Sequence, residues 1–174
     1  MPKPNILQTK ELARAEKLLA RCNLPFTILD NPDYRSFMEK EVAKYVLPSK
    51  SSVRKVYLEK TVAKKRKEML ASLDGKSLYV MFDETSFKNR SIFTALVGDC
   101  NSPRTPYILG IQECETVNAN VVAQTINRWL QKTFDLFSLK VLLSDGAAYC
   151  IKAGKILKEF YEDLIHIRSL ALGL

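Results

Sequence analysis

The order of apolar runs in the second half of the chain limits the possible folds more than any other feature of the sequence. Three short runs rich in strand-forming residues come first, followed by a helical pattern, a fourth run, a second helical pattern and a fifth run. The order β-β-β-α-β-α-β therefore indicates an α/β domain built on one sheet. The predicted strands cover 78–82, 91–97, 107–111, 140–143 and 164–167, and the predicted helices cover 118–134 and 147–160.

The connections between these runs predict the topology of the sheet. Short loops join the first three strands, so these strands can form an antiparallel meander. The helix at 118–134 permits a crossover that brings the fourth strand beside the first in parallel, and the fifth follows in the same sense. This is the plan of the ribonuclease H fold, and other α/β orders share parts of it. We expect a ribonuclease H-like mixed sheet, incomplete at the C-terminus and preceded by a helical region.

The first half of the chain is predicted to be helical. Apolar residues recur at helical spacing over residues 9–22, which predicts a first helix. Asn31-Pro32 is typical of the start of a helix, so we expect a second helix that runs to about residue 45. A third helix should run from about residue 52 to 73, where Asp74-Gly75 ends it. The second helix is expected to bury Phe37, Met38 and Val42.

Charge divides the chain into two parts. Residues 1–76 carry 17 Lys and Arg against 9 Asp and Glu, whereas residues 77–174 carry 10 of each. The whole net charge of +8 therefore lies in the first part. We expect two domains with these boundaries, a basic helical one and a neutral α/β one, and a polyanionic partner for the basic domain.

The excess of positive charge is greatest along the third predicted helix. Two interpretations stay open: a solvated helix face, or a ridge that contacts the phosphates of DNA without regard to base sequence. Between residues 50 and 70, the only acidic residues beside the many Lys and Arg side chains are Glu59 and Glu68. The candidate DNA-binding residues are Lys50, Arg54, Lys55, Lys60, Lys64, Lys65, Arg66 and Lys67.

Several classes of protein are disfavoured. No apolar run approaches the ~18 residues that cross a bilayer, and the N-terminus lacks the apolar region of a secretory signal, so we expect an intracellular protein without membrane contact. The four cysteines form no Cys-x-x-Cys pair, and we expect reduced, buried thiols. His166 is the only histidine, so no zinc is expected and any metal site would need carboxylates.

Two aspartates are candidates for a metal site and for catalysis. Asp83 and Asp145 each follow a predicted strand, and parallel neighbouring strands lie about 4.8 Å apart. Carboxylates that meet there suit Mg²⁺ or Mn²⁺, and two such ions can assist displacement at phosphorus. The alternative is structural: Asp145 caps the helix that begins near Gly146, and Asp83 only ends a strand.

Four segments, which lie in order within residues 12–174, together resemble the hAT superfamily of DNA transposases. They are most similar to the branch related to the CGG triplet-repeat-binding protein. The segments are Asn-Leu-Pro-Phe-Thr-Ile-Leu-Asp-Asn-Pro at 23–32, Leu-Pro-Ser-Lys-Ser-Ser-Val-Arg at 47–54, Asp-Glu-Thr-Ser at 83–86, and Leu-Ser-Asp-Gly-Ala-Ala-Tyr at 143–149 with Ile-Lys-Ala-Gly-Lys at 151–155.

The resemblance implies a catalytic core of the ribonuclease H type, preceded by a helical region that binds DNA and dimerises. It implies that Asp83 and Asp145 match the first two members of a metal-binding Asp-Asp-Glu triad. It also implies a nuclear protein, DNA as the partner and a possible homodimer.

The sequence departs from the family pattern at three points. The third carboxylate of the family lies far downstream, beyond the residues printed here, and the family's N-terminal zinc finger is absent. Ser169 and Leu172 stand where the family has a Cys-x-x-His pair, and Glu162 and Asp163 precede the fifth strand, at the wrong end of the sheet to act as substitutes. We therefore expect a truncated or domesticated transposase-derived protein that binds DNA without transposition activity of its own. The alternatives are a fragment or subunit of an active metal-dependent transposase, and a protein-interaction scaffold.

Overall fold

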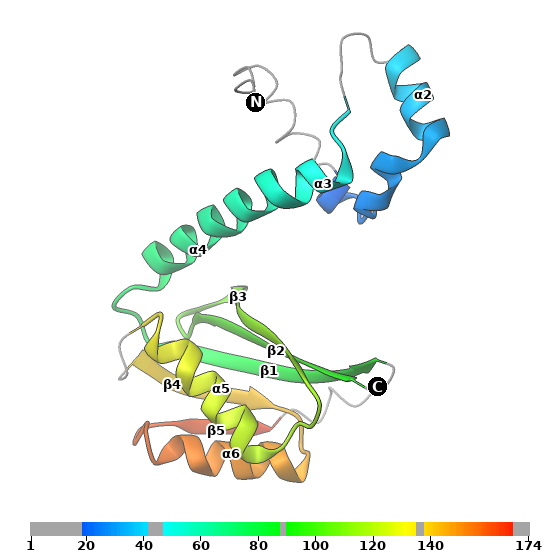
Figure 1. Cartoon of the computed structure of the whole chain (residues 1–174). Helices are drawn as coiled ribbons and strands as arrows, with labels where there is room; N and C mark the ends of the chain where they lie inside the picture. Colours follow the sequence, from blue (N-terminus) through cyan, green and yellow to red (C-terminus); the bar gives the residue numbers. More distant parts are fainter. Residues whose placement is uncertain (1–18, 42–46, 88–89, 135–137, 169–174) are drawn as a thin grey trace. The chain divides into compact units, whose positions relative to one another are not determined.

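The computed structural model describes residues 19–41, 47–87, 90–134 and 138–168, as two compact units. The units cover residues 1–68 and 69–174, so their boundary falls inside a helix and ahead of the charge boundary at residues 76 and 77. Figure 1 shows the helices and strands of both units. The expected helix over 9–18, the end of the second helix at 42–45, and Ser169 and Leu172 lie outside the described residues.

The second unit contains a five-stranded mixed sheet with the order β3-β2-β1-β4-β5. β1 pairs with β2 and β2 with β3 in antiparallel ladders, whereas β4 pairs in parallel with both β1 and β5. This arrangement confirms the ribonuclease H-like sheet, including the crossover that places β4 beside β1. The strands are β1 Leu78–Phe87, β2 Arg90–Asp99, β3 Ser102–Cys114, β4 Leu139–Ser144 and β5 Ile165–Arg168.

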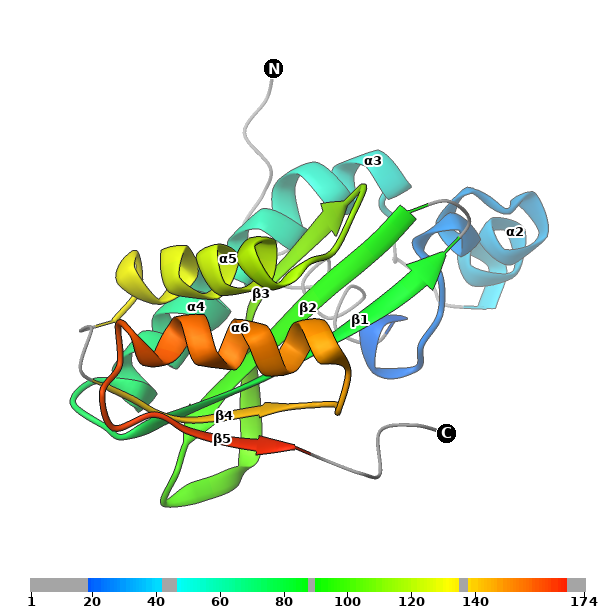
Figure 2. The ribbon, with the colours of Figure 1, turned by 90° about the horizontal axis from the view of Figure 1, so that it is seen from below.

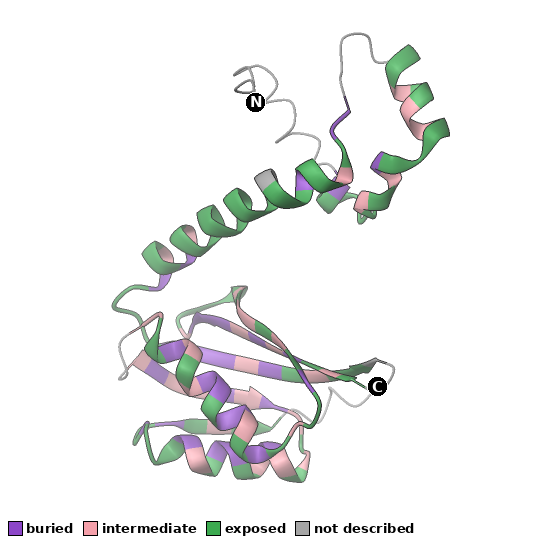
Figure 3. Ribbon diagram, in the orientation of Figure 1, coloured by how far each residue is buried: buried purple, intermediate pink, exposed green. Residues whose placement is uncertain are grey.

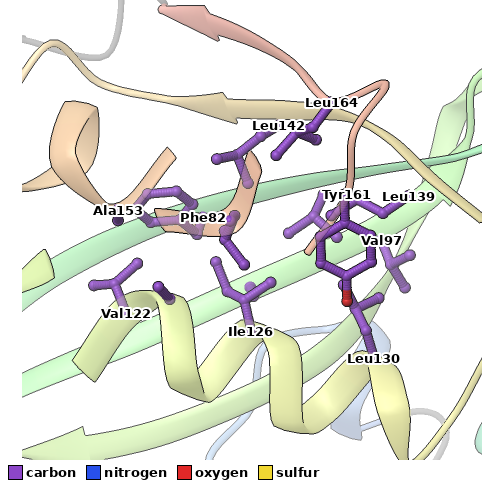
Figure 4. Close-up of a cluster of buried hydrophobic side chains, with 14 of the residues drawn as sticks. Phe82, Val97, Val122, Ile126, Leu130, Leu139, Leu142, Ala153, Tyr161 and Leu164 are labelled. Atoms are coloured by element: carbon purple, nitrogen blue, oxygen red, sulfur yellow. The ribbon is translucent and has the colours of Figure 1, made fainter. Parts of the chain in front are cut away.

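Two helices, α5 Ala119–Gln131 and α6 Ala148–Lys158, lie on the same face of the sheet (Figure 2). Asn118 begins α5, because its Oδ1 accepts hydrogen bonds from the backbone N–H groups of Asn120 and Val121. Figure 4 shows the core between these layers, where apolar side chains of α5 and α6 meet those of β1, β2 and β4. The fully or nearly fully buried members include Phe82, Val97, Val122, Ile126, Leu130, Leu142 and Ala153.

The strands of the antiparallel part are longer than the sequence predicts. β1 does not end at Asp83 but continues to Phe87, so the expectation that Asp83 ends its strand is wrong. The reason is the partner strand: the polar residues after Phe82 stay extended because each pairs with a residue of β2, down to Phe87 opposite Arg90.

The other face of the sheet carries an apolar row that crosses all five strands. The register places its members side by side, and alternation along the strands, interrupted by register shifts in the β1–β4 and β2–β3 ladders, directs them away from α5 and α6. Tyr79 and Cys100 help to line a hollow of about 180 Å³ beside this row. The row consists of Ile108, Leu96, Met81, Leu143 and Ile167.

The first unit is helical, as expected. A short 3₁₀ helix at Phe26–Asp30 precedes α2 Pro32–Glu41, and Asn31 caps α2 by accepting a hydrogen bond from the backbone N–H of Tyr34. Further along the chain, α3 Lys50–Ser52, a π-helical segment Val53–Leu58 and α4 Glu59–Leu73 follow one another without a break.

A small apolar cluster and one arginine hold this unit together. Leu29 and Val53 are fully buried in the cluster, and the guanidinium of Arg35 donates hydrogen bonds to the carbonyls of Leu29, at 2.8 Å, and Leu47, at 3.2 Å. The expected burial of Phe37 is wrong, because its side chain is 60% exposed. Met38 is half-buried against the cluster, and Val42 lies outside the described residues.

Cysteine burial follows the expectation only in part. Cys114 and Cys150 are buried in the core of the second unit and Cys100 is half-buried. Cys22 is exposed, so the expectation of a buried thiol is wrong there. The preceding helix ends at Arg21, and Cys22 lies in the turn before Pro25.

Candidate functional site

The register between β1 and β4 puts the two candidate aspartates at matching positions, Asp83 within β1 and Asp145 directly after β4. The last pair in this parallel ladder is Met81 with Leu143, and Asp83 and Asp145 each lie two residues further on. Alternation along β1 puts Asp83 on the same face as Met81, away from α5 and α6. Both aspartates therefore lie at one edge of the sheet, next to the apolar row.

Both carboxylates are tied to the backbone near them. Oδ1 of Asp83, which is exposed, accepts a hydrogen bond from the backbone N–H of Glu84 at 2.8 Å. Oδ1 of the half-buried Asp145 accepts one from the backbone N–H of Ala147 at 3.1 Å, just before α6 begins. Asp145 thus orders the turn that leads into α6, but the expectation that it caps this helix is wrong, because Ala147 is the N-cap residue and no side chain caps the first turn. Burial, and then this carboxylate, raise the pKa of the Cys150 thiol to about 12.

Polar side chains gather beside Asp145 on the helix-covered side of the sheet. Oγ of Ser144, which is fully buried, lies 2.9 Å from Nε2 of His166 on β5. The hydroxyl of Tyr149, in the first turn of α6, donates a hydrogen bond to Oε2 of Glu84 at 3.0 Å. Desolvation by burial raises the pKa of Tyr149, so this phenol stays protonated and keeps its role as donor.

The sequence reasoning did not identify the hydrogen bond between Tyr149 and Glu84. The available signal was the alternation along β1, which puts Glu84 on the same face as Phe82 and therefore toward the helices. It could not identify Tyr149 as the partner, because the orientation of α6 over the sheet is a property of the packed structure.

The donor set at this edge suits a hard divalent cation. Mg²⁺ is often held by one or two carboxylates and completes its shell with water, which fits two aspartates on adjacent strands. Within the described ranges, no group of three or more His, Cys, Asp or Glu side chains is placed to hold a metal ion. Asp163 lies before β5 and pairs with Lys140 of β4 at 2.8 Å, so it lies at the opposite end of the sheet from Asp145, as predicted.

The candidate DNA-binding residues differ in whether they form an ion pair and in where they lie on the helices. Lys50 forms an ion pair with Asp30 at 3.0 Å, and Lys65 forms one with Glu68 at 2.7 Å. Arg54 and Lys55 are exposed on the π-helical segment, and Arg66 is exposed on α4.

Three lysines of α4 form a separate stripe. Lys60, Lys64 and Lys67 are exposed, and at 100° per residue they fall within about 60° of one another around the helix. The buried Met69 and Leu73 lie on the opposite side, and neither acidic residue of α4 falls within the stripe. Figure 3 shows how little of α4 is buried. We call these three residues the lysine stripe.

No family model matches the chain, and no curated protein matches it. Among solved structures, the chain is similar to the catalytic core domain of BIV integrase, with 20% identity and a TM-score of 0.39. That match covers 55% of this chain and 56% of the integrase chain, so it spans little more than half of each.

Every helix in the described ranges is too short or too polar to span a bilayer. The fold assignment rests on the strand order and register rather than on the integrase likeness. What these observations establish is a ribonuclease H-like fold that presents two aspartates at one edge of its sheet.

Proposed function

We propose that this chain derives from a DNA transposase of the hAT superfamily, binds DNA through the phosphate backbone, and does not cut DNA by itself. The observation that carries the proposal is the register of β1 and β4, since Asp83 and Asp145 each follow its last pair by two residues. The four sequence segments that resemble the superfamily support the assignment of origin. The exposed lysine stripe supports DNA as the partner.

In this proposal, the acidic edge formed by Asp83 and Asp145 supplies part of a cation site. Asp83 and Asp145 supply carboxylate oxygens, which Mg²⁺ and Mn²⁺ prefer. A divalent cation bound there would stabilise negative charge that develops on a phosphate group. Two carboxylates alone leave the position of such a cation loosely defined, and catalysis depends on closely fixed charges. Among the residues that the structure describes, no third His, Cys, Asp or Glu side chain joins such a group.

The lysine stripe accounts for DNA binding without base specificity. From Lys60 to Lys67 the helix rises about 10 Å, so the stripe can follow one backbone strand across a few phosphates. Long, flexible lysine side chains act as point charges and read no base edges. Each phosphate neutralised should contribute about −0.9 to the slope of log affinity against log salt concentration.

The test is a salt titration of DNA binding by fluorescence anisotropy with a short labelled duplex. We expect a slope of roughly −3 to −4 for the unmodified chain, nearly independent of DNA sequence. Changing Lys60, Lys64 and Lys67 together to Ala should reduce the magnitude of the slope by about 2.7.

The matched control removes the same charge from another exposed surface. Lys152, Lys155 and Lys158 lie on α6 and are exposed, and their joint change to Ala should leave most of the slope in place. If the two triple variants lose affinity and slope equally, or if neither loses any, the stripe is only a solvated surface.

A protein-interaction scaffold is the second candidate function. The apolar row on the open face of the sheet favours it, because Ile108 and Ile167 are 61% and 46% exposed there. A chain that fails to bind DNA even at low salt would support this candidate against the first.

A further inference from the structure

The two aspartates lie just beyond the point where β1 and β4 stop pairing with each other. The β1–β4 ladder ends at Met81 and Leu143, after which β1 continues along β2 while the chain after β4 turns into α6. Strand pairing therefore fixes the residues before Asp83 and Asp145 but does not fix the aspartates against each other. A cation shared by two carboxylates needs that separation to be held.

A chain of hydrogen bonds crosses this gap. The backbone N–H of Glu84 donates to Asp83, and the side chain of Glu84 accepts from the hydroxyl of Tyr149 at 3.0 Å. Tyr149 lies in the first turn of α6, two residues after Ala147, whose backbone N–H donates to Asp145. The contact between Glu84 and Tyr149 thus links the segment that carries one aspartate to the segment that carries the other.

We propose that Tyr149 and Glu84 are positioning residues, which hold Asp83 and Asp145 at the separation that a shared divalent cation needs. This inference rests on the cation site of the proposed function. Neither residue has to touch the cation, because Glu84 lies on the helix-covered face of β1 and Asp83 on the other.

The surroundings of the Glu84–Tyr149 contact make it suitable for this task. The ring of Tyr149 packs against the hydrophobic core, and both residues are half-buried, so the hydrogen bond lies in a medium of low dielectric constant. Partners that orient metal ligands in this way typically change metal affinity by about 10–100-fold when they are removed.

The test is a titration of residues 1–174 with Mn²⁺, followed by the electron paramagnetic resonance signal of the free ion. Tyr149→Phe removes only the hydroxyl and should weaken Mn²⁺ binding about tenfold. Glu84→Ala should weaken it to a similar degree, and the double variant should be no weaker than either single one, because both changes break one hydrogen bond. Glu84→Gln keeps an acceptor oxygen and should stay near the unmodified affinity.

A second buried tyrosine supplies the matched control. Tyr161 is 4% exposed, and its hydroxyl donates to Oδ1 of Asn127 at 2.9 Å, at the opposite end of α6 from Tyr149. Tyr161→Phe should lower thermal stability about as much as Tyr149→Phe does and should leave Mn²⁺ affinity unchanged.

The outcomes separate this inference from the function on which it rests. Absence of Mn²⁺ binding by the unmodified chain, or binding that survives Asp83→Asn, contradicts the cation site and this inference together. Binding that is lost in Asp83→Asn but unchanged in Tyr149→Phe and Glu84→Ala contradicts the positioning role alone. If Tyr149→Phe fails to fold, Glu84→Ala and its rescue by Glu84→Gln decide the question.

Discussion

At the scale of single residues, Asp145 has two roles that one substitution can separate. Its Oδ1 accepts a hydrogen bond from the backbone N–H of Ala147 and so orders the turn that leads into α6, while its charge belongs to the candidate cation site. Asn keeps an acceptor oxygen and removes the charge, whereas Ala removes both.

We therefore predict that Asp145→Asn unfolds at nearly the same urea concentration as the unmodified chain but loses Mn²⁺ binding. Asp145→Ala should lose Mn²⁺ binding and also about 1 kcal/mol of stability, the usual net contribution of one hydrogen bond. Urea denaturation and the Mn²⁺ titration measure the two properties separately. If Asp145→Asn keeps its affinity for Mn²⁺, Asp145 is not a cation ligand and has only the structural role.

The type of a residue was enough to predict helix capping but not side-chain exposure or ion pairing. The capping roles of Asn31 and Asn118 follow from their own short side chains and could be predicted from position. The exposure of Phe37 and the ion pair of Lys50 with Asp30 could not, because they depend on which segment packs against each helix.

At the scale of elements, the contact between α6 and β5 makes stability depend on pH. The ring of His166 lies against Gly154 of α6, where a Cβ atom would overlap it, and its Nε2 lies 2.9 Å from Oγ of Ser144. Burial, and then the positive charges of Arg168 and Lys158, lower the pKa of His166 below its ordinary 6.5. The unfolded chain therefore binds this proton more readily than the folded chain does.

We predict that His166 does not change the free energy of unfolding as the pH varies above 6.5. Below pH 6.5, the free energy of unfolding should fall as the pH drops toward the pKa of His166 in the folded chain. The measurement is the urea midpoint across that range, together with the NMR titration of the ring, which is simple because His166 is the only histidine. His166→Gln removes the titrating group and should flatten the profile. A folded-state pKa above 6.5 would contradict the burial of the ring.

The sequence predicted element types and their order better than element lengths. Helix and strand periodicity placed all five strands, α5, α6 and the long helix that ends at Leu73. The polar end of β1 was missed because Asp83 and Glu84 are poor strand formers by themselves, and pairing with β2 keeps them extended.

At the scale of the whole molecule, topology could be predicted because few connections satisfy the observed order. A short-looped meander followed by a helical crossover leaves β4 two parallel neighbours to choose from, β1 and β3, and the structure has the pair with β1. The approximate position of the aspartates follows from this topology alone. The hydrogen bonds that hold them do not, since they depend on how α6 packs over the sheet.

The central claim is that residues 1–174 bind DNA but do not cut it unaided. The most direct measurement is incubation of the chain with a labelled duplex carrying hAT-type terminal repeats, with Mg²⁺ or Mn²⁺, analysed for both complex formation and strand cleavage. The account predicts a complex that dissociates as salt is raised, and no cleavage products. Cleavage that Asp83→Ala abolishes would contradict it, since it would mean that a third ligand completes the site.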